Sequence, residues 1–495
     1  MTSIWITSHP PVVDAPPLAG DLKVDVVVVG AGLTGLLTAW RLCDAGYRVA
    51  VLEAGSAGQK NTGLATGNLY GSTSNMASLL AKWGEDVLRH VVEARRRAID
   101  WIEDLTLRHS LQCGFTRAPL QWSVESSEAA VLQRHDSELA AYRAAGLDPR
   151  PSSAGLPFPL ARSFQVTGQA QLDPYQLCRA LLGGLSERVA IFENTAVTDV
   201  DAARGCVSTA SGKVHADHIV LATHSPAGFN LVQAEMEVYR EYGIAIPVAA
   251  TPTAGIHWVT DCGRSLRSVP GQLMPLLVVV GEKHRAGEWS PAQDPGGRLL
   301  EYARHRFPVN GPVKAAWSAQ QFLSADGLPY VGSSAHDNVW VATGFHADGL
   351  TWAGVASRLI VQGIEGKQDD LGHLLSPLRL TPIRSAKGWA KANATVARHI
   401  VGDRLKADPD PGLELAPGSG CIAGRGGDRH AVYRDEAGTL HVLSPVCPHL
   451  KCIVQWNGEA RSWDCPCHGS RFAPTGELLE GPALSGLTRK PYPID

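Results

Sequence analysis

The chain has 495 residues, a formal net charge of −3 and 44% hydrophobic residues. This length exceeds one core of ordinary size, so we expect two or three domains. The small net charge, without a basic cluster, argues against binding to nucleic acid or to an anionic membrane surface. No apolar run of about 18 residues occurs, which argues against a transmembrane helix, and the first residues lack the pattern of a secretory signal, so we expect a cytoplasmic location.

A dinucleotide-binding unit is predicted near the N-terminus, after a proline-containing leader over residues 1–22 that we expect to be extended. The apolar run V-D-V-V-V-V at 24–29 predicts a strand buried on both faces of a parallel sheet. The sequence continues with G-A-G-L-T-G at 30–35, a helical stretch and a second strand that ends at Glu53. This spacing predicts a cofactor pyrophosphate at the helix N-terminus and Glu53 on the adenosine ribose, without separating FAD from NAD.

Each glycine of this turn has an expected role. Gly30 permits the tight turn, Gly32 lets the backbone approach the pyrophosphate, and Gly35 lets the helix pack closely on the strand. The residues of this unit that we expect to bind the cofactor are Gly30, Gly32, Leu33, Thr34, Gly35, Glu53 and Ala54.

The middle of the chain alternates between helices and strands. Residues 56–71 form a glycine-rich loop expected over the cofactor, and residues 76–105 predict a helix whose Arg95, Arg96 and Arg97 we expect on a solvated face. Further helices are expected at 126–145 and from Asp173 onward. Strands are predicted at 190–192, 196–199, 207–209 and 219–223, with Val197 and Thr223 as cofactor-binding candidates.

A strand-rich region with several prolines follows at 239–281, and we interpret it as a sheet that caps the substrate. Five of its polar residues could bind a substrate carboxylate, although a structural role is the more common one for each. They are Arg240, Tyr242, His257, Arg264 and His284. We assign no catalytic residue.

A second glycine-rich site is predicted from D-G-L-P-Y-V-G at 326–332, W-V-A-T-G-F at 340–345 and the helix that opens after residue 348. The helix N-terminus suits negative charge, and its candidates are Gly344, Gly349, Leu350 and Thr351. With the N-terminal unit, these motifs resemble the D-amino acid oxidase, glycine oxidase and sarcosine oxidase family over residues 20–370. The resemblance implies FAD and oxidation of a C–N bond. No tethering His or Cys stands at 56–71 or around Trp317, so we expect non-covalent FAD.

The C-terminal part contains two ligand turns. Residues 371–410 predict a linker with a helix at 386–401, and the glycine-rich stretch at 418–424 predicts a hairpin turn. Beyond it, Cys447 and His449 form a C-x-H turn, and Cys465 and His468 form a C-x-x-H turn. Two thiolates and two imidazoles suit either tetrahedral zinc or a Rieske [2Fe-2S] centre.

The strings C-P-H-L-K-C at 447–452 and C-P-C-H-G-S at 465–470 resemble the Rieske proteins of respiratory and photosynthetic complexes. The resemblance implies a disulfide between Cys452 and Cys467, which structural zinc would not need, and a hydroxyl of Ser470 beside the cluster sulfurs. Phe472 replaces an aromatic hydroxyl that bonds a ligand sulfur in those proteins, which should lower the reduction potential, whereas the cation of Lys451 should raise it. If the two histidines are exposed at the tip, the potential should depend on pH.

These patterns predict an α/β FAD-binding domain with an interleaved α+β substrate cap, followed by a small all-β Rieske domain. We expect FAD-binding parts at 23–110, 165–235 and 310–370, cap parts at 111–164 and 236–309, and the Rieske domain at 411–495. The expected activity is a dehydrogenase that oxidises an amine or amino acid and passes electrons through the cluster to an external protein or quinone. An NAD(P)H-driven reductase, or a non-catalytic redox sensor, is the alternative.

Overall fold

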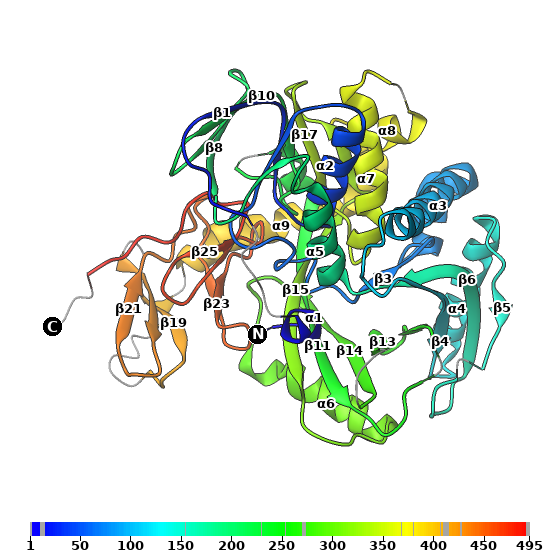
Figure 1. The fold of residues 1–495 in the computed structure, drawn as a ribbon. Coiled ribbons are helices and arrows are strands. Elements are labelled where there is room, and N and C mark those ends of the chain that lie inside the picture. The colour runs from blue at the N-terminus through cyan, green and yellow to red at the C-terminus, as the bar shows by residue number, and fades with distance from the viewer. Residues whose placement is uncertain are drawn as a thin grey trace.

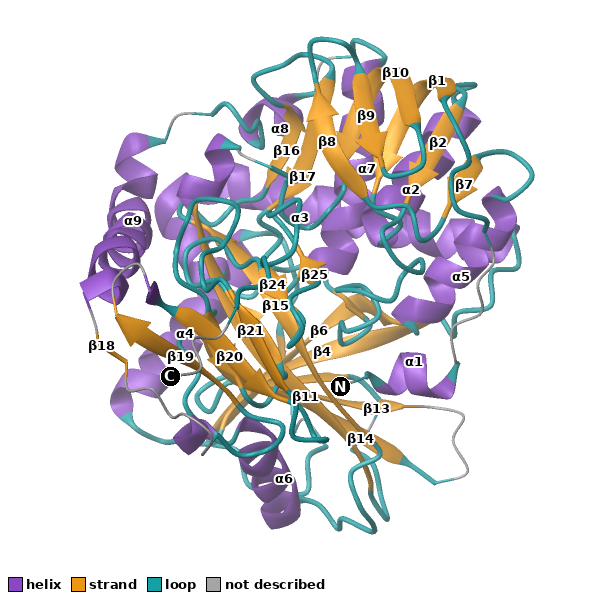
Figure 2. Cartoon of the chain, turned by 90° about the vertical axis from the view of Figure 1, so that its left-hand side faces the viewer, coloured by secondary structure: helices purple, strands orange, loops and turns teal. Residues whose placement is uncertain are grey.

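The computed structural model describes residues 2–9, 15–153, 155–228, 230–252, 254–269, 274–367, 369–379, 381–405, 407–408, 415–425 and 428–491. Two large sheets and a small two-sheet domain make up the chain (Figures 1 and 2). This arrangement confirms the fold class expected from the sequence. No helix among these residues has the length and apolar character needed to cross a membrane.

The first sheet is the dinucleotide-binding one. Its strands run in the order β16-β17-β10-β1-β2-β7, all parallel except β16, and β8 and β9 form a hairpin beside β10. They are β1 (Leu22–Val29), β2 (Val49–Leu52), β7 (Ala190–Phe192), β8 (Val197–Asp201), β9 (Cys206–Thr209), β10 (Lys213–Leu221), β16 (Tyr330–Ser333) and β17 (Val339–Thr343). Val26 and Val28 belong to one hydrophobic core and Val27 and Val29 to another, so both faces of β1 are buried as expected.

The second sheet forms the cap, in the order β15-β11-β14-β13-β12-β4-β6-β3, with β5 beside β6. Its strands are β3 (Asn68–Leu69), β4 (Thr116–Val124), β5 (Arg150–Pro151), β6 (Arg162–Gln171), β11 (Met236–Pro247), β12 (Ile256–Val259), β13 (Arg264–Val269), β14 (Leu276–Arg285) and β15 (Ala315–Ser324). This sheet extends beyond the cap boundaries expected at residues 164 and 309. The strand β6 pairs in it from Arg162 to Gln171, and β15 pairs with β11 from Ala315 to Ser324.

Helices cover these sheets, and Figure 2 shows them in purple. They are α2 (Leu33–Asp44), α3 (Met76–Arg108), α4 (Ala129–Ala144), α5 (Pro174–Leu185), α6 (Pro295–Arg306), α7 (Gly349–Ile364) and α8 (Asp370–Leu374). The short 3-10 turns η1 (Leu231–Glu235) and η2 (Pro291–Gln293) lie in connections. The side chains of α2 and α7 share one hydrophobic core with those of α3 and α5.

The expectation of an extended leader is wrong at its start, because α1 (Ile4–Ser8) is helical. Its N-cap, Ser3, accepts a hydrogen bond from the amide of Ile6. Ile4 and Trp5 are buried in one cluster with side chains of the cap sheet, and the indole N–H of Trp5 donates to the carbonyl of Ala65 at 2.8 Å. Tertiary burial therefore stabilises a five-residue helix that would not persist alone. Pro10 and Pro11 lie outside the described residues.

The C-terminal domain follows α9 (Pro382–Leu405) and lies beside β11 and β15, in orange and red in Figure 1. One of its sheets has β18 (Ala407–Asp408), β19 (Gly420–Arg425), β20 (His430–Arg434) and β21 (Leu440–Leu443). The other has β22 (Gln455–Asn457), β23 (Ser462–Asp464), β24 (Arg471–Phe472) and β25 (Leu478–Glu480). The glycine-rich stretch at 418–424 turns at Gly418 and then enters β19, so most of it is strand, and the described residues that follow lead into β20. The start of this domain, expected at residue 411, lies outside the described residues, and β18 before it already pairs with β19.

A buried contact fixes the C-terminal domain on the cap sheet. Arg240 of β11 and Asp464 of β23 form an ion pair at 3.3 Å with both side chains fully buried. Asn457 donates to the hydroxyl of Tyr242 at 3.1 Å, and Gln320 of β15 donates to the carbonyl of Gly469 at 2.8 Å. These contacts define the docked position of the domain, because each of these polar groups meets its partner only in this arrangement.

Replacing Arg240 with Met should destabilise the full chain by about 3 kcal/mol, because Asp464 would keep its buried charge with less compensation. Urea unfolding followed by tryptophan fluorescence measures this change. Arg97→Met is the matched control: Arg97 pairs with Glu93 on an exposed face of α3, so its loss should change stability by less than about 0.5 kcal/mol. An equally small effect of Arg240→Met would contradict the role of the buried pair.

Candidate active site and metal centre

One cavity of about 840 Å³ connects the two large sheets and the C-terminal domain. Ten of the residues predicted to bind a cofactor line it, namely Gly30, Gly32, Leu33, Thr34, Glu53, Ala54, Val197, Thr223, Gly349 and Leu350. The C-terminal domain closes part of the wall with a segment around Leu478, Glu480 and Leu484. A volume of this size and its apolar lining suit a bound cofactor with room for a small substrate.

Two glycines of the turn, Gly30 and Gly35, lie where a side chain would overlap the backbone of the protein. Gly30 has φ of 104°, and a Cβ there would lie 2.7 Å from the carbonyl oxygen of Ala222. A Cβ on Gly35 would overlap the carbonyl oxygen of Gly30, so Gly35 serves the packing of α2 on β1 and does not line the cavity. Gly32 is the N-cap of α2 and opens the helix N-terminus toward the cavity.

The carboxylate of Glu53 lies at the end of β2. It accepts hydrogen bonds from the amides of Ala31 at 2.8 Å and Gly55 at 3.0 Å. Burial raises the pKa of Glu53, and these two amides oppose that rise. Thr62, from the loop at 56–71, accepts a hydrogen bond from the amide of Leu33 at 3.1 Å, so this loop folds against the glycine turn.

The residues of the second predicted site, around the start of α7, fall into two groups. Gly349 and Leu350, at the N-terminus of α7, line the cavity, whereas Gly344 and Thr351 do not. Gly344 adopts φ of 74° in the turn before the helix. The hydroxyl of Thr351 accepts a hydrogen bond from the amide of Tyr70 at 2.9 Å, so it fixes the loop instead of facing a ligand.

The expectation that Arg95 lies on a solvated face is wrong. Its side chain is fully buried, 3.4 Å from the carboxylate of Asp348 just before α7, and it donates to the carbonyl of Ser72 at 2.6 Å. Its guanidinium also lies 4.8 Å from the ring of Trp352. Arg95 therefore anchors the start of α7, while Arg96 and Arg97 are exposed as predicted.

The five polar cap residues have different surroundings. Arg240 and Tyr242 contact the C-terminal domain, and Tyr242 also lines the cavity. His284 contacts the hydroxyl of Tyr242 at 3.0 Å. His257 is fully buried. Arg264 lines the cavity but pairs with Glu282. Sequence reasoning missed other polar and aromatic residues that line the cavity, among them Tyr70, Glu241, Trp258, Lys283, Gln321 and His346.

The alternation in β11 could have revealed part of this set. Val238, Arg240 and Tyr242 are buried, and Glu237, Tyr239 and Glu241 between them are half-buried. A period of two separates the buried residues, which include Arg240 against the C-terminal domain, from the half-buried Glu237 and Glu241.

The four predicted metal ligands form two contacting pairs, one of thiols and one of imidazoles, in the ligand turns of the C-terminal domain. The side chains of Cys447 and Cys465 are in hydrogen-bonding contact, which lowers the pKa of Cys447 to about 7. The rings of His449 and His468 lie 5.1 Å apart at 90°. Nε2 of His449 and Nδ1 of His468 are buried and have no hydrogen-bond partner among the described residues. Adjacent thiols and orphaned imidazole nitrogens are the donor set that a [2Fe-2S] cluster of the Rieske type needs.

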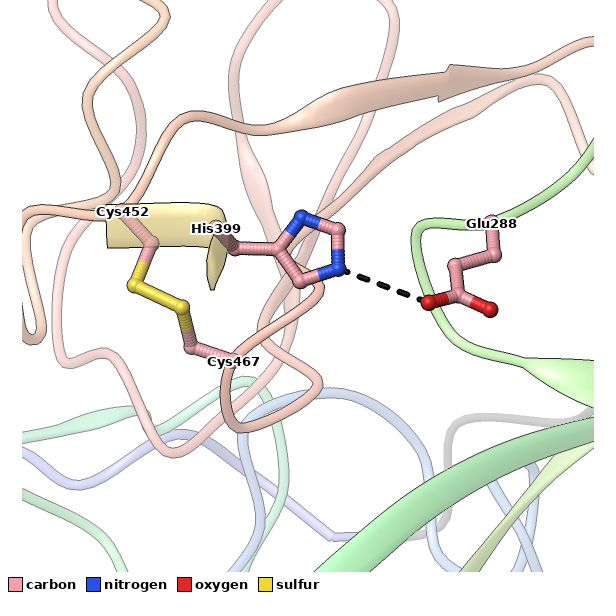
Figure 3. Close-up of a disulfide and its surroundings, with 4 residues drawn as sticks. All are labelled: Glu288, His399, Cys452 and Cys467. Carbon is pink, nitrogen blue, oxygen red and sulfur yellow. Dashed lines mark ion pairs between the residues drawn. A yellow bond between two sulfur atoms is a disulfide. The ribbon is translucent and has the colours of Figure 1, made fainter. Parts of the chain in front are cut away.

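Cys452 and Cys467 form a disulfide that joins the two ligand turns, shown in Figure 3 beside His399 and Glu288. Sγ of Cys465 lies within 4.8 Å of both disulfide sulfurs. Because two of these three sulfurs are bonded to each other, Cys447 is the thiol available to serve as a metal ligand together with Cys465. Ser470 lies beside Cys447 and hydrogen bonds to it, and the ring of Phe472 is fully buried.

The tip does not protrude into solvent. His468 is 6% exposed, and His449 is half-buried and hydrogen bonds to the backbone of Gly228. Gly469, next to His468, accepts the hydrogen bond from Gln320, which itself lines the large cavity. The two histidines are therefore not exposed in the way that a pH-dependent potential would require. The second ligand turn, at residues 465–470 and called the cluster loop below, lies against the cavity wall.

Comparison with known proteins agrees with this geometry. Residues 25–362 match the model of the FAD dependent oxidoreductase family, and residues 413–491 match that of the Rieske [2Fe-2S] domain. The Rieske 2Fe-2S iron-sulfur protein YhfW of Bacillus subtilis is 30% identical over 95% of this chain and 94% of its own length. Glycine oxidase of Pseudomonas aeruginosa is 24% identical over 69% of this chain and 95% of its own.

Among solved structures, glycine oxidase of Geobacillus kaustophilus superposes with a TM-score of 0.60 at 19% identity and covers 73% of this chain and 100% of its own. The N-terminal match implies FAD and the C-terminal match implies a [2Fe-2S] cluster. The chain thus belongs to the FAD-dependent oxidoreductase family and ends in a Rieske [2Fe-2S] domain.

Proposed function

We propose that the protein is a dehydrogenase that oxidises a C–N bond of an amine or an N-methyl amino acid and delivers the electrons singly, through the Rieske cluster, to an external protein or quinone. The observation that carries the proposal is Gln320, which lines the large cavity and also binds Gly469 beside His468. A flavin in the cavity would therefore have the cluster loop as its neighbour, at a fixed position.

Residues of this chain would hold both groups. Glu53 lines the cavity and would accept a hydrogen bond from a ribose hydroxyl, and the N-terminus of α2 at Gly32 would bind the pyrophosphate. A bound flavin would supply the chemistry of taking two electrons from the substrate. The N-terminus of α7 would stabilise the negative charge on the reduced flavin ring. The proposed cluster ligands are Cys447, His449, Cys465 and His468. The described residues contain no second dinucleotide fold, which disfavours an NAD(P)H-driven reductase.

Anaerobic titration of the purified holoprotein tests the proposal. We expect at least one amine or amino acid from a broad panel to bleach the flavin absorption and then to reduce the cluster, followed by its own absorption and by electron paramagnetic resonance. NADH and NADPH should bleach neither chromophore. Flavin that stays oxidised with every member of the panel would contradict the proposed activity.

Replacing Gln320 with Leu should slow electron transfer from flavin to cluster by up to about fivefold, because the turn at Gly469 loses a hydrogen bond worth about 1 kcal/mol and can move away from the cavity wall while the domain stays docked. Flavin reduction by substrate should keep its rate. Stopped-flow absorption separates the two phases. Gln121→Leu is the matched control, since Gln121 is a buried glutamine of β4 that bonds Gln165 within the cap. Equal rates of the second phase in both variants would contradict a coupling role for Gln320.

Replacing Cys465 with Ser should abolish the Rieske signal in electron paramagnetic resonance, because the thiolate ligand is lost. Flavin content and flavin reduction by substrate should remain, since Cys465 does not line the cavity. Cys421→Ser, in β19 outside the ligand turns, should leave the signal intact. A Rieske signal that survives in Cys465→Ser would exclude Cys465 as a ligand.

A further inference from the structure

Two opposite charges face the cavity from neighbouring strands. In the pairing of β11 with β14, Arg240 is opposite His284 and Tyr242 is opposite Gly281, so Glu241 is opposite both Glu282 and Lys283. This is a β-bulge, and Glu282 adopts φ of 55° within it. The bulge turns Glu282 toward Arg264 and leaves Lys283 next to Glu241, and both Glu241 and Lys283 line the cavity.

The other charged side chains of the cavity wall are already compensated. Glu53 accepts two amide hydrogen bonds at the adenosine end, near Lys60. Arg264 pairs with Glu282, and Glu480 pairs with Arg471 at 2.5 Å. Burial lowers the pKa of His346 to about 3 and that of His224 to about 4, so both imidazoles are neutral at neutral pH.

Glu241 and Lys283 differ from these groups. Glu241 accepts one hydrogen bond, from the amide of Gln321, and Lys283 lies 4.9 Å from the ring of Tyr239. Neither forms a direct ion pair with a described residue, although each charge favours the other. A half-enclosed carboxylate and ammonium that face the same space without a direct ion pair are stabilised by a ligand that supplies both opposite charges.

We propose that Glu241 and Lys283 are the specificity-determining pair of the substrate site and select a zwitterionic amino acid over a simple amine, with the substrate ammonium at Glu241 and its carboxylate at Lys283. This inference rests on the proposed function and narrows its substrate class. The aromatic side chains of Tyr70 and Trp258, whose rings lie 4.6 Å apart, form an apolar wall of the same cavity for the rest of the substrate.

Binding measurements on the full holoprotein test the pair without requiring turnover. The probes form matched sets that share a skeleton: proline, pyrrolidine and cyclopentanecarboxylate in one set, and N-methylglycine, dimethylamine and propionate in the other. Affinity is read from the change in flavin absorption under anaerobic conditions or, for a probe that reduces flavin, from the concentration dependence of the fast phase. We expect the zwitterion of at least one set to bind at least about tenfold more tightly than either half.

Single substitutions assign the two charges. Lys283→Met should weaken binding of the zwitterion and the carboxylate about tenfold and leave the amine unchanged, and Lys283→Arg should restore most of the loss. Glu241→Gln should weaken the zwitterion and the amine by a similar factor and leave the carboxylate unchanged. Glu237→Gln is the matched control on the same face of β11, because Glu237 pairs with Arg285 and does not line the cavity.

The result that overturns the inference is an amine that binds as tightly as its zwitterion in both sets, or a Lys283→Met variant that weakens amine and zwitterion equally. Failure of every probe to bind the wild-type protein at saturating concentrations also counts against it. Flavin reduced by simple amines alone would leave the proposed dehydrogenase intact and remove only the zwitterion selectivity. A protein that binds zwitterions with the expected selectivity but never passes electrons to its flavin would keep the site and lose the proposed activity.

Discussion

The ion pair between Arg240 and Asp464 joins two domains through charges that water does not reach. Burial disfavours both charges, so each is tolerated only with its partner in place. The pair extends into a network, because Arg471 lies 3.3 Å from Asp464 and 2.5 Å from Glu480, and Glu480 lines the cavity. Since Asp464 directly precedes Cys465, the network fixes the second ligand turn relative to the cavity.

Strand β11 makes this arrangement possible by its alternation. Val238 and Arg240 face the C-terminal domain, and Tyr242 contacts it and also lines the cavity. Glu241, between them, accepts a hydrogen bond from Gln321 and lines the cavity with Lys283. A slip of one residue in the pairing with β15 would exchange the two faces, which would bury Glu241 under the cluster loop. One register therefore sets both the contact with the Rieske domain and the charges offered to a substrate.

Sequence patterns are most informative for features whose geometry depends on residues that are close together in the chain. The glycine turn, Glu53 and the two ligand turns fall within short spacings, and their residue types have few other uses. Arg95, α1 and Gln320 could not be predicted, because their roles depend on contacts with Asp348, with the cap sheet and with Gly469, which are far away in sequence. The β-bulge at Glu282 is equally hidden, since no local signal distinguishes it from a regular strand. Sequence spacing thus identified the groups that would hold the cofactors, and the tertiary contacts identified how the two sites are connected.

Under the proposed function, electrons would enter the ligand turns on the side that faces the cavity and leave them on a different, exposed side. Gly228 and Gln320 cover the ligand turns on the side of the cavity, where an electron from a flavin would arrive. In the first ligand turn, Leu450 is 38% exposed and Lys451 is exposed, directly after His449. Solvent reaches the first ligand turn there while the domain stays docked, whereas undocking would break the pair of Arg240 with Asp464. Under the proposed function, a docked domain that is buried on one side and open on the other can pass electrons outward without the swinging motion that a mobile carrier needs.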